Sequence, residues 1–491
     1  MKTRLLSLML LLSIFLTLKA QNPEELPLFN INQLTYSGAF RMSASSNGVS
    51  DLNYSQGPIA YNAKNHSLFI VGHAHQQAIA EYAIPDLVES EVLSDLIMVT
   101  EPIQVFSKVL NKATGGNPEG IDRVGGLYVV NESGQDRLIV NAYEYYDAPA
   151  DNTLTTLILD NANDIENATA NGYYKFNGGA GHTSGWLSTI PTNWQEKLGG
   201  THITGQSSGI PIISRASVGP SAFAFNMQDL LNTTDNINTV KLLDFSLTNR
   251  LHDDLSNETL NNDIWTHLSR SVYGFVVPGT RTYLTIGNSG GHSSGVCYKC
   301  TQDNGNLCGG YCTPVASDNY QYYWLWDLKD LIAVKNGVLE AHEVYPYDYG
   351  LFSSPFQAGS MRRIGGGSFD PITGNLYLSI QKGDTEQGTY ARPPVIVVYK
   401  VDSEALSNNE PVIDEIMIYP NPTSDNIFVS GLYDTSTIRI TDVIGKTIKI
   451  FETNEKTAEI DLSTFASGTY FISIRNEVTQ IRYIKKIIKK E

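Results

Sequence analysis

Cysteine is scarce in this 491-residue chain, and basic residues are outnumbered by acidic ones. There are 4 Cys, and 34 Lys and Arg stand against 51 Asp and Glu, which gives a net charge of -17. The negative charge lies in residues 21–414, whose net charge is -20. Residues 1–20 contribute +3, and the charges of residues 415–491 sum to zero. A body this acidic excludes nucleic acid and anionic membrane surfaces as its main partners.

Long hydrophobic runs are also lacking, and this excludes a transmembrane segment. The apolar run at residues 5–16 is shorter than the ~20 residues that a bilayer span needs. Lys2 and Arg4 precede this run, and Ala20 supplies a small residue before Gln21. The pattern predicts a cleaved secretory signal at residues 1–20.

Zinc-protease and nucleotide-binding motifs are missing as well. His-Glu-x-x-His and Walker sequences do not occur. The run Gly365–Gly367 precedes an expected strand rather than a helix, so it does not predict a phosphate-binding loop. Whether the protein is an enzyme is left open by the sequence.

What the chain does have is repeated β structure. The whole sequence is also rich in Tyr (27) and Gly (41). Residues 61–70 align without a gap on residues 369–378, and each reads as an aromatic strand end, a polar turn and an apolar strand. Residues 275–283 repeat the same aromatic spacing. These patterns predict hairpins.

A second repeated element follows the hairpins as an apolar strand. It occurs at residues 80–87, 223–230 and 324–331, more loosely at 155–165, and finally at 395–401. Copies spaced by about 65 to 100 residues are typical of four-stranded blades with loop insertions. We therefore predict an all-β fold in which residues 21–401 form a β-propeller of five to seven blades, with a β-sandwich array or a β-solenoid as alternatives.

The ends of this body are expected to meet. Pairing of residues 34–40 with residues 395–399 would close the propeller and remove its free sheet edges. Residues 269–399 resemble uncharacterised exported bacterial propeller-like proteins, through residues 277–282, 326–331 and 365–371. That resemblance implies a fold and no activity.

A polar linker is expected at residues 402–414, followed by a distinct segment at residues 415–491. The segment opens with Tyr419-Pro420-Asn421-Pro422, has a turn at Gly445 and ends in a Lys-rich run. It resembles the sorting domain (type A) of the type IX secretion system. Its alternation and length predict a small seven-strand β-sandwich. The resemblance implies the type IX machinery as partner and a secreted or outer-surface location reached through the periplasm.

The four cysteines lie within sixteen residues, at positions 297, 300, 308 and 312. Four thiolates this close can hold structural zinc, and Cys297-x2-Cys300 has metal-like spacing. An even number of cysteines in an oxidising compartment favours disulfides. We expect disulfides, with zinc at Cys297, Cys300, Cys308 and Cys312 as the alternative.

Several polar residues lie in Gly-rich loops. His182, His202, Arg215 and Tyr273, with Arg270, suggest a polysaccharide lyase in which Arg neutralises a uronate while His and Tyr act as base and acid. The carboxylate pairs Asp253-Asp254 and Glu144-Asp147 leave structural Ca2+ open. We expect a surface-attached or secreted protein that binds a glycan or protein ligand, with a polysaccharide-active enzyme as the alternative.

Overall fold

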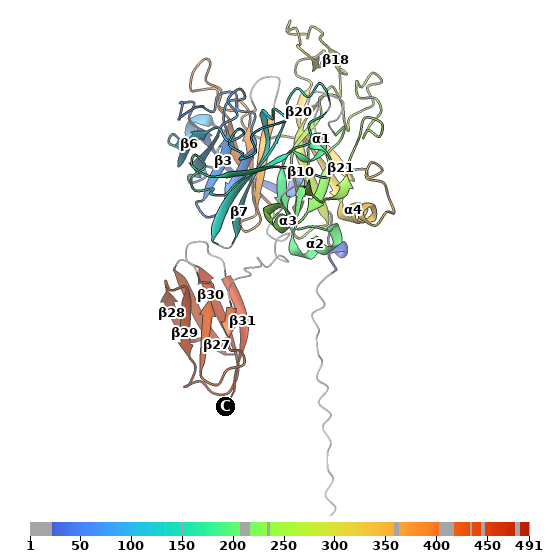
Figure 1. The fold of residues 1–491 in the computed structure, drawn as a ribbon. Coiled ribbons are helices and arrows are strands. Elements are labelled where there is room, and N and C mark those ends of the chain that lie inside the picture. Colours follow the sequence, from blue (N-terminus) through green and yellow to red (C-terminus); the bar gives the residue numbers. More distant parts are fainter. Residues whose placement is uncertain are drawn as a thin grey trace, which may run out of the picture. The chain divides into compact units, whose positions relative to one another are not determined.

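The computed structural model describes residues 22–132, 134–149, 151–206, 217–232, 236–357, 363–401, 417–432, 435–442, 447–476 and 482–490. The chain divides into two compact units, Met1–Asn409 and Glu410–Glu491. Both are built mostly of strands (Figure 1). The all-β class predicted from the sequence is confirmed, while the propeller remains a prediction. The expected signal and linker lie outside the described residues.

Five antiparallel sheets of four principal strands make up the described part of the larger unit. Their strands, sheet by sheet, are β2 (Ile59–Asn62), β3 (Ser67–Val71), β4 (Ile79–Ala83) and β6 (Gln104–Ser107); β7 (Arg123–Glu132), β8 (Gln135–Tyr143), β9 (Thr156–Leu159) and β10 (Ala170–Phe176); β11 (Leu187–Thr189), β12 (His202–Thr204), β13 (Ala222–Phe225) and β15 (Val240–Leu243); β16 (Arg270–Val277), β17 (Thr282–Gly290), β20 (Asn319–Asp327) and β21 (Asp348–Phe352); and β22 (Ile364–Asp370), β23 (Asn375–Ile380), β24 (Val395–Val401) and β1 (Leu34–Met42).

Short elements complete this unit. Two-residue strands β5 (Met98–Val99) and β14 (Asn236–Ile237) pair in parallel with β1 and β10, and β18 (Cys297–Tyr298) pairs with β19 (Tyr311–Cys312). The helices are η1 (Pro23–Glu25), η2 (Ile31–Gln33), η3 (Leu93–Asp95), α1 (Ala180–Thr183), α2 (Thr192–Leu198), α3 (Met227–Asn232) and α4 (Leu328–Lys335). Within the described ranges, no helix is long and apolar enough to cross a membrane.

The sequence repeats occupy equivalent places in these sheets. Residues 61–70, 275–283 and 369–378 each contain the turn between a first and a second strand. The second repeated element supplies the third strand of all five sheets, namely β4, β9, β13, β20 and β24. A short helix follows this strand at β13 and β20, and Asp327 caps α4 by accepting a hydrogen bond from the Lys329 N–H.

The first strand of the chain completes the last sheet. β1 runs antiparallel to β24, with Leu34 opposite Val401 and Ala39 opposite Val397. This is the pairing expected from the sequence. It joins the two ends of the unit in one sheet, so a sheet edge that would otherwise face solvent is covered.

The five first strands also contact one another in a closed cycle. β2 packs against β7, β7 against β11, β11 against β16, β16 against β22, and β22 against β2. Glycines allow the backbones to meet. A Cβ on Gly57 would lie 2.3 Å from the carbonyl carbon of Gly365, and one on Gly126 would lie 2.0 Å from the Gly185 oxygen.

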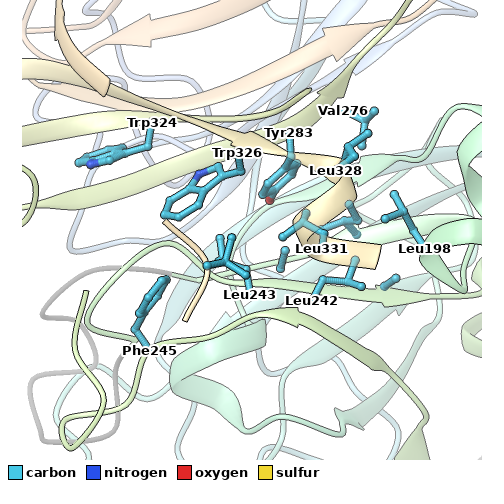
Figure 2. Close-up of a cluster of buried hydrophobic side chains, with 14 of the residues drawn as sticks. Leu198, Leu242, Leu243, Phe245, Val276, Tyr283, Trp324, Trp326, Leu328 and Leu331 are labelled. Atoms are coloured by element: carbon cyan, nitrogen blue, oxygen red, sulfur yellow. The ribbon is translucent and has the colours of Figure 1, made fainter. Parts of the chain in front are cut away.

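Tryptophan side chains fill the spaces between sheets rather than the surface. Trp324 and Trp326 of β20 and Tyr283 of β17 are fully buried, and they lie over leucines of β15 and α4 (Figure 2). Trp186 and Trp194 are buried as well. Packing between sheets therefore accounts for these tryptophans, which do not form an exposed sugar-stacking face.

The smaller unit has its own core. One sheet contains β25 (Met417–Tyr419), β26 (Asn426–Ser430) and β29 (Thr457–Asp461); the other contains β28 (Thr447–Thr453), β27 (Ser436–Asp442), β30 (Gly468–Asn476) and β31 (Arg482–Lys489). Buried residues of both sheets, such as Ile427, Val429, Ile438 and Ile472, form one cluster. The seven strands expected from the sequence are present in the described ranges, and the sandwich remains a prediction.

Candidate functional site

A small cavity lies where the five first strands begin. Gly57, Arg123, Trp186, Arg270 and Gly365 line it, and each comes from the start of the first strand of a different sheet, or from just before it. Its volume is about 60 Å³. A single water occupies ~10–15 Å³ of such a cavity volume, so the cavity has room for a few waters or one small polar group.

Arginine dominates the charge at this cavity. Arg123 and Arg270 line it, and Arg363, which immediately precedes β22, is close enough for its charge to oppose that of Arg270. Burial lowers the pKa of Arg270, and burial together with the Arg270 charge lowers the pKa of Arg363 to about 10. Both guanidinium groups still carry their charge at neutral pH.

These charges lack acidic partners within the described ranges. Neither Arg270 nor Arg363 forms an ion pair there, and Arg123 reaches only its exposed neighbour Asp122, at 3.9 Å. Two half-buried guanidinium groups without a carboxylate are costly to hold, because little water remains to solvate them. An anion entering the cavity would offset that cost.

Two tyrosines at the end of β8 border the arginines. Tyr143 lines the cavity opposite Arg123 in the β7–β8 pair, and the Arg123 guanidinium lies 4.6 Å from the ring centroid of Tyr145. Burial raises the pKa of Tyr143 to about 12, although Arg270 and Arg123 act in the opposite direction. The Tyr143 hydroxyl is therefore protonated at neutral pH and can donate a hydrogen bond.

Loops that follow the second strands start at the cavity, because strand direction alternates within each sheet. Asn288, near the end of β17, pairs with Arg270, so the loop between β17 and β20 starts at the cavity end of its sheet. The same holds for the loop after Tyr143. Connections into the first strands also end here. Glu144 and Asp147, in the loop after Tyr143, and the cysteines, in the loop between β17 and β20, therefore belong to one face.

His182 lies in α1, in a connection that leads to this face. Its Nδ1 is 2.6 Å from Oδ1 of Asp244, and Nζ of Lys241 is 2.9 Å from Oδ2 of the same carboxylate. Burial alone would raise the pKa of Asp244, but the bonds from His182 and Lys241 outweigh it and lower the pKa. Asp244 therefore orients His182. His182 is not among the residues that line the cavity.

His202 lies at the opposite end of its sheet. It pairs with Thr189 at the far end of β11, whereas Trp186 precedes β11 at the cavity. Its Nε2 is 3.0 Å from the Tyr128 hydroxyl and its Nδ1 is 2.9 Å from that of Thr201. Burial lowers the pKa of His202 to about 3. This is a neutral histidine with both nitrogens occupied.

Tyr273 is enclosed between β16 and β22. Its hydroxyl accepts a hydrogen bond from the Phe369 N–H at 2.8 Å, and burial raises its pKa. Arg215 lies outside the described residues. The three described members of the predicted catalytic set, His182, His202 and Tyr273, thus contact different partners, and the structure does not bring them together at the cavity. Their catalytic roles stay predictions.

The sequence carries a signal for Arg123 and Arg363, which are not in the predicted catalytic set. Arg123 and Arg363 are each followed after one residue by two glycines, and Arg270 holds the corresponding place at the start of β16. Alignment of the five first strands would have placed three arginines in register. Tyr143 offered no such signal, because it stands at the end of a second strand.

The cysteines lie in a hairpin on the cavity face. Disulfides join Cys297 to Cys300 and Cys308 to Cys312. Both nitrogens of His292 bond elsewhere, to the Asn262 carbonyl and the Ser289 hydroxyl, so it does not replace a thiol. Both cysteine pairs thus lie at the disulfide distance that the sequence favoured.

Three acidic side chains gather at the calcium position predicted for Glu144 and Asp147. Glu144 and Asp147 lie with Asp151 so that one oxygen from each is within 4.8 Å of the others. Asp147 is fully buried and accepts hydrogen bonds from the Asp151 and Asn152 N–H groups. Those bonds account for its burial without an ion, so Ca2+ here stays a prediction.

Comparison with known proteins identifies the smaller unit. Residues 417–490 match the family described as secretion system C-terminal sorting domain. The resemblance to a type IX sorting domain seen in the sequence is therefore confirmed. The type IX machinery follows as a partner, and the chain is exported to the cell surface or secreted.

Two further comparisons give weaker matches to the chain. An endo-acting ulvan lyase of Formosa agariphila is 28% identical over 138 residues, which cover 28% of this chain and 25% of that enzyme. A solved structure of PorZ, a surface component of the type IX secretion system of Porphyromonas gingivalis, is 14% identical and covers 91% of this chain. This chain spans about half (53%) of that one, and the TM-score of 0.29 carries no argument about the fold.

Proposed function

We propose that the protein is an exported five-bladed β-propeller that binds an anionic glycan at its axial cavity. Five consecutive four-stranded sheets, the closed cycle of first strands and the pairing of β1 with β24 support the propeller. The type IX sorting domain supports a role at the cell surface or beyond it. The ligand is inferred from the cavity.

The pair of guanidinium groups at the cavity carries the proposal. Arg123 and Arg270 come from different sheets and converge on a space of about 60 Å³. That space suits one carboxylate or sulfate group, which guanidinium binds through paired, charge-assisted hydrogen bonds. The acidic body repels polyanions elsewhere, so binding depends on an acidic group reaching this one basic point.

Binding ranks above catalysis because of what lines the cavity. Its described lining contains Gln, Gly, Pro, Val, Arg, Tyr, Trp and Ser, with no Asp, Glu or His among them. Tyr143 is protonated and suits an acid rather than a base. A general base that removes a carbon-bound proton is thus missing from the described lining.

Polysaccharide lyase activity remains the second proposal. Arg270 lies beside Tyr143 in the cavity lining. A uronate neutralised by Arg270 would therefore meet the Tyr143 hydroxyl as a proton donor. The partial match to an enzyme named as an endo-acting ulvan lyase adds support, limited by its 138-residue extent. In this proposal, His182 with Asp244 is a base-and-orienting pair outside the cavity lining.

The test compares full-length protein with polygalacturonate and with its methyl ester, which lacks the charge. We expect Arg123→Gln and Arg270→Gln each to weaken binding by about tenfold or more, since a hydrogen bond to a charged group contributes ~1.5–3 kcal/mol. Arg281→Gln is the matched control, because Arg281 is paired with Asp327 at 3.0 Å. Isothermal calorimetry provides the affinities.

Two outcomes would change the conclusion. Equal binding of the ester and the acid would rule out anion recognition at the cavity. Release of ultraviolet-absorbing unsaturated product by the wild-type chain, lost in Tyr143→Phe, would replace the binding function with the lyase.

A further inference from the structure

The cysteine hairpin has no hydrophobic core of its own. All four cysteines are half-buried, Tyr298 and Tyr311 between them are 60% and 48% exposed, and Leu307 is 75% exposed. No residue from 297 to 312 belongs to the buried core. A segment of this kind depends on cross-links or a metal for its order.

Three of the four sulfurs also meet at one point. Sγ of Cys312 lies 3.3 Å from Sγ of Cys300 and 3.9 Å from Sγ of Cys297. These three sulfurs lie within 4.8 Å of one another, and the fourth, on Cys308, is bonded to Cys312. Two independent disulfides have no need to touch, whereas ligands of one ion must converge, as these three sulfurs do.

The spacing of these three sulfurs fits thiolates that share one tetrahedral zinc. Zinc–sulfur bonds of ~2.3 Å place neighbouring sulfurs about 3.8 Å apart, between the two non-bonded distances seen here. Backbone pairing fixes the arrangement: Cys297 is opposite Cys312 in the β18–β19 pair, and the Cys308 N–H donates to the Cys300 carbonyl. The hairpin therefore holds the four cysteines together even without the sulfur–sulfur bonds.

We propose that Cys297, Cys300, Cys308 and Cys312 form a zinc site in the reduced chain, and that the two disulfides are its metal-free, oxidised state. Each disulfide takes two electrons and two protons from one dithiol reductant, which becomes a cyclic disulfide. The four resulting thiols release four protons as their thiolates bind one Zn2+. Each state would hold the hairpin closed beside the cavity.

The experiment uses the full chain, reduced with dithiothreitol and desalted without oxygen in the presence of one equivalent of Zn2+. We expect one zinc and four titratable thiols per chain, measured by mass spectrometry of metal content and by thiol reagent. In Cys312→Ser the zinc content should fall at least tenfold. His267→Ala is the control, because His267 stacks on Tyr311 and should leave zinc content unchanged.

A second measurement uses the wild-type chain, so it tests the proposal even if the Cys312→Ser variant fails to fold. Wild-type chain loaded with Co2+ should show the thiolate-to-cobalt charge-transfer and ligand-field bands of a tetrahedral sulfur site. Reduced wild-type protein that holds no zinc, or cobalt spectra without those bands, would overturn the proposal. Retention of zinc in Cys312→Ser would do the same.

Discussion

Burial has opposite chemical results for histidine and arginine in this protein. His202 is buried with neutral partners and gives up its charge, so its pKa falls to about 3. The pKa of Arg270 is lowered as well, but from so high a starting value that the group keeps its proton. His202 is therefore explained by packing alone, while Arg270 leaves a charge to be neutralised. This difference distinguishes His202, whose burial needs no ligand, from Arg270, which we propose binds one.

The buried histidine predicts how stability depends on pH. Because the unfolded chain binds a proton at His202 below about pH 6.5 and the folded chain does not until about pH 3, acid favours unfolding in that window. We expect His202 to contribute a loss of up to about 1.4 kcal/mol per pH unit as pH falls through it. Urea unfolding at several pH values measures this slope.

The matched variant for this prediction is His202→Gln, which keeps a hydrogen-bonding side chain and does not titrate. Its free energy of unfolding should fall less steeply with acid than that of the wild type. Identical slopes in the two chains would contradict the assignment of His202 as a neutral buried residue.

At the scale of the element, glycine decides how closely the first strands meet. Gly126 of β7 faces the Gly185 backbone just before β11, and a Cβ there would lie 2.0 Å from the Gly185 oxygen. Any side chain at this position would force the two sheets apart. The closed cycle of first strands, and with it the small cavity, depends on such contacts.

We therefore expect Gly126→Ala to destabilise the larger unit by about 1–3 kcal/mol, the usual cost of overpacking. The control is Gly115→Ala in the loop before β7, where the nearest atom to a Cβ is 3.8 Å away. Thermal unfolding compares the two variants. A Gly126→Ala chain as stable as the control would show that this strand contact is not required.

For the whole molecule, the two units have separate cores. Trp324, Phe40 and their neighbours stabilise the larger unit, whereas Ile438 and Ile472 belong to the smaller one. The larger unit is closed by β1 and β24, which lie at opposite ends of its sequence. Closure of this kind makes its sheets mutually dependent, while the sorting domain can unfold by itself.

Calorimetry of the full chain should accordingly resolve two transitions. Ile438→Ala, in the smaller core, is expected to cost about 2–5 kcal/mol and lower one transition only. Phe40→Ala, in β1, should lower the other by a similar or larger free energy. A single transition that moves with both variants would mean that the units unfold together.

The sequence by itself determined the sorting domain, the all-β class and the third strand of each sheet, because motif, alternation and repeat are local properties of the chain. It also indicated that residues 34–40 would pair with residues 395–399. Only the tertiary structure decided which polar residues meet. Arg123, Arg270 and Arg363 are separated by more than ninety residues each, and they converge only when the cycle of strands is complete. His202 shares a Gly-rich setting with His182, but strand direction carries it to the opposite end of its sheet.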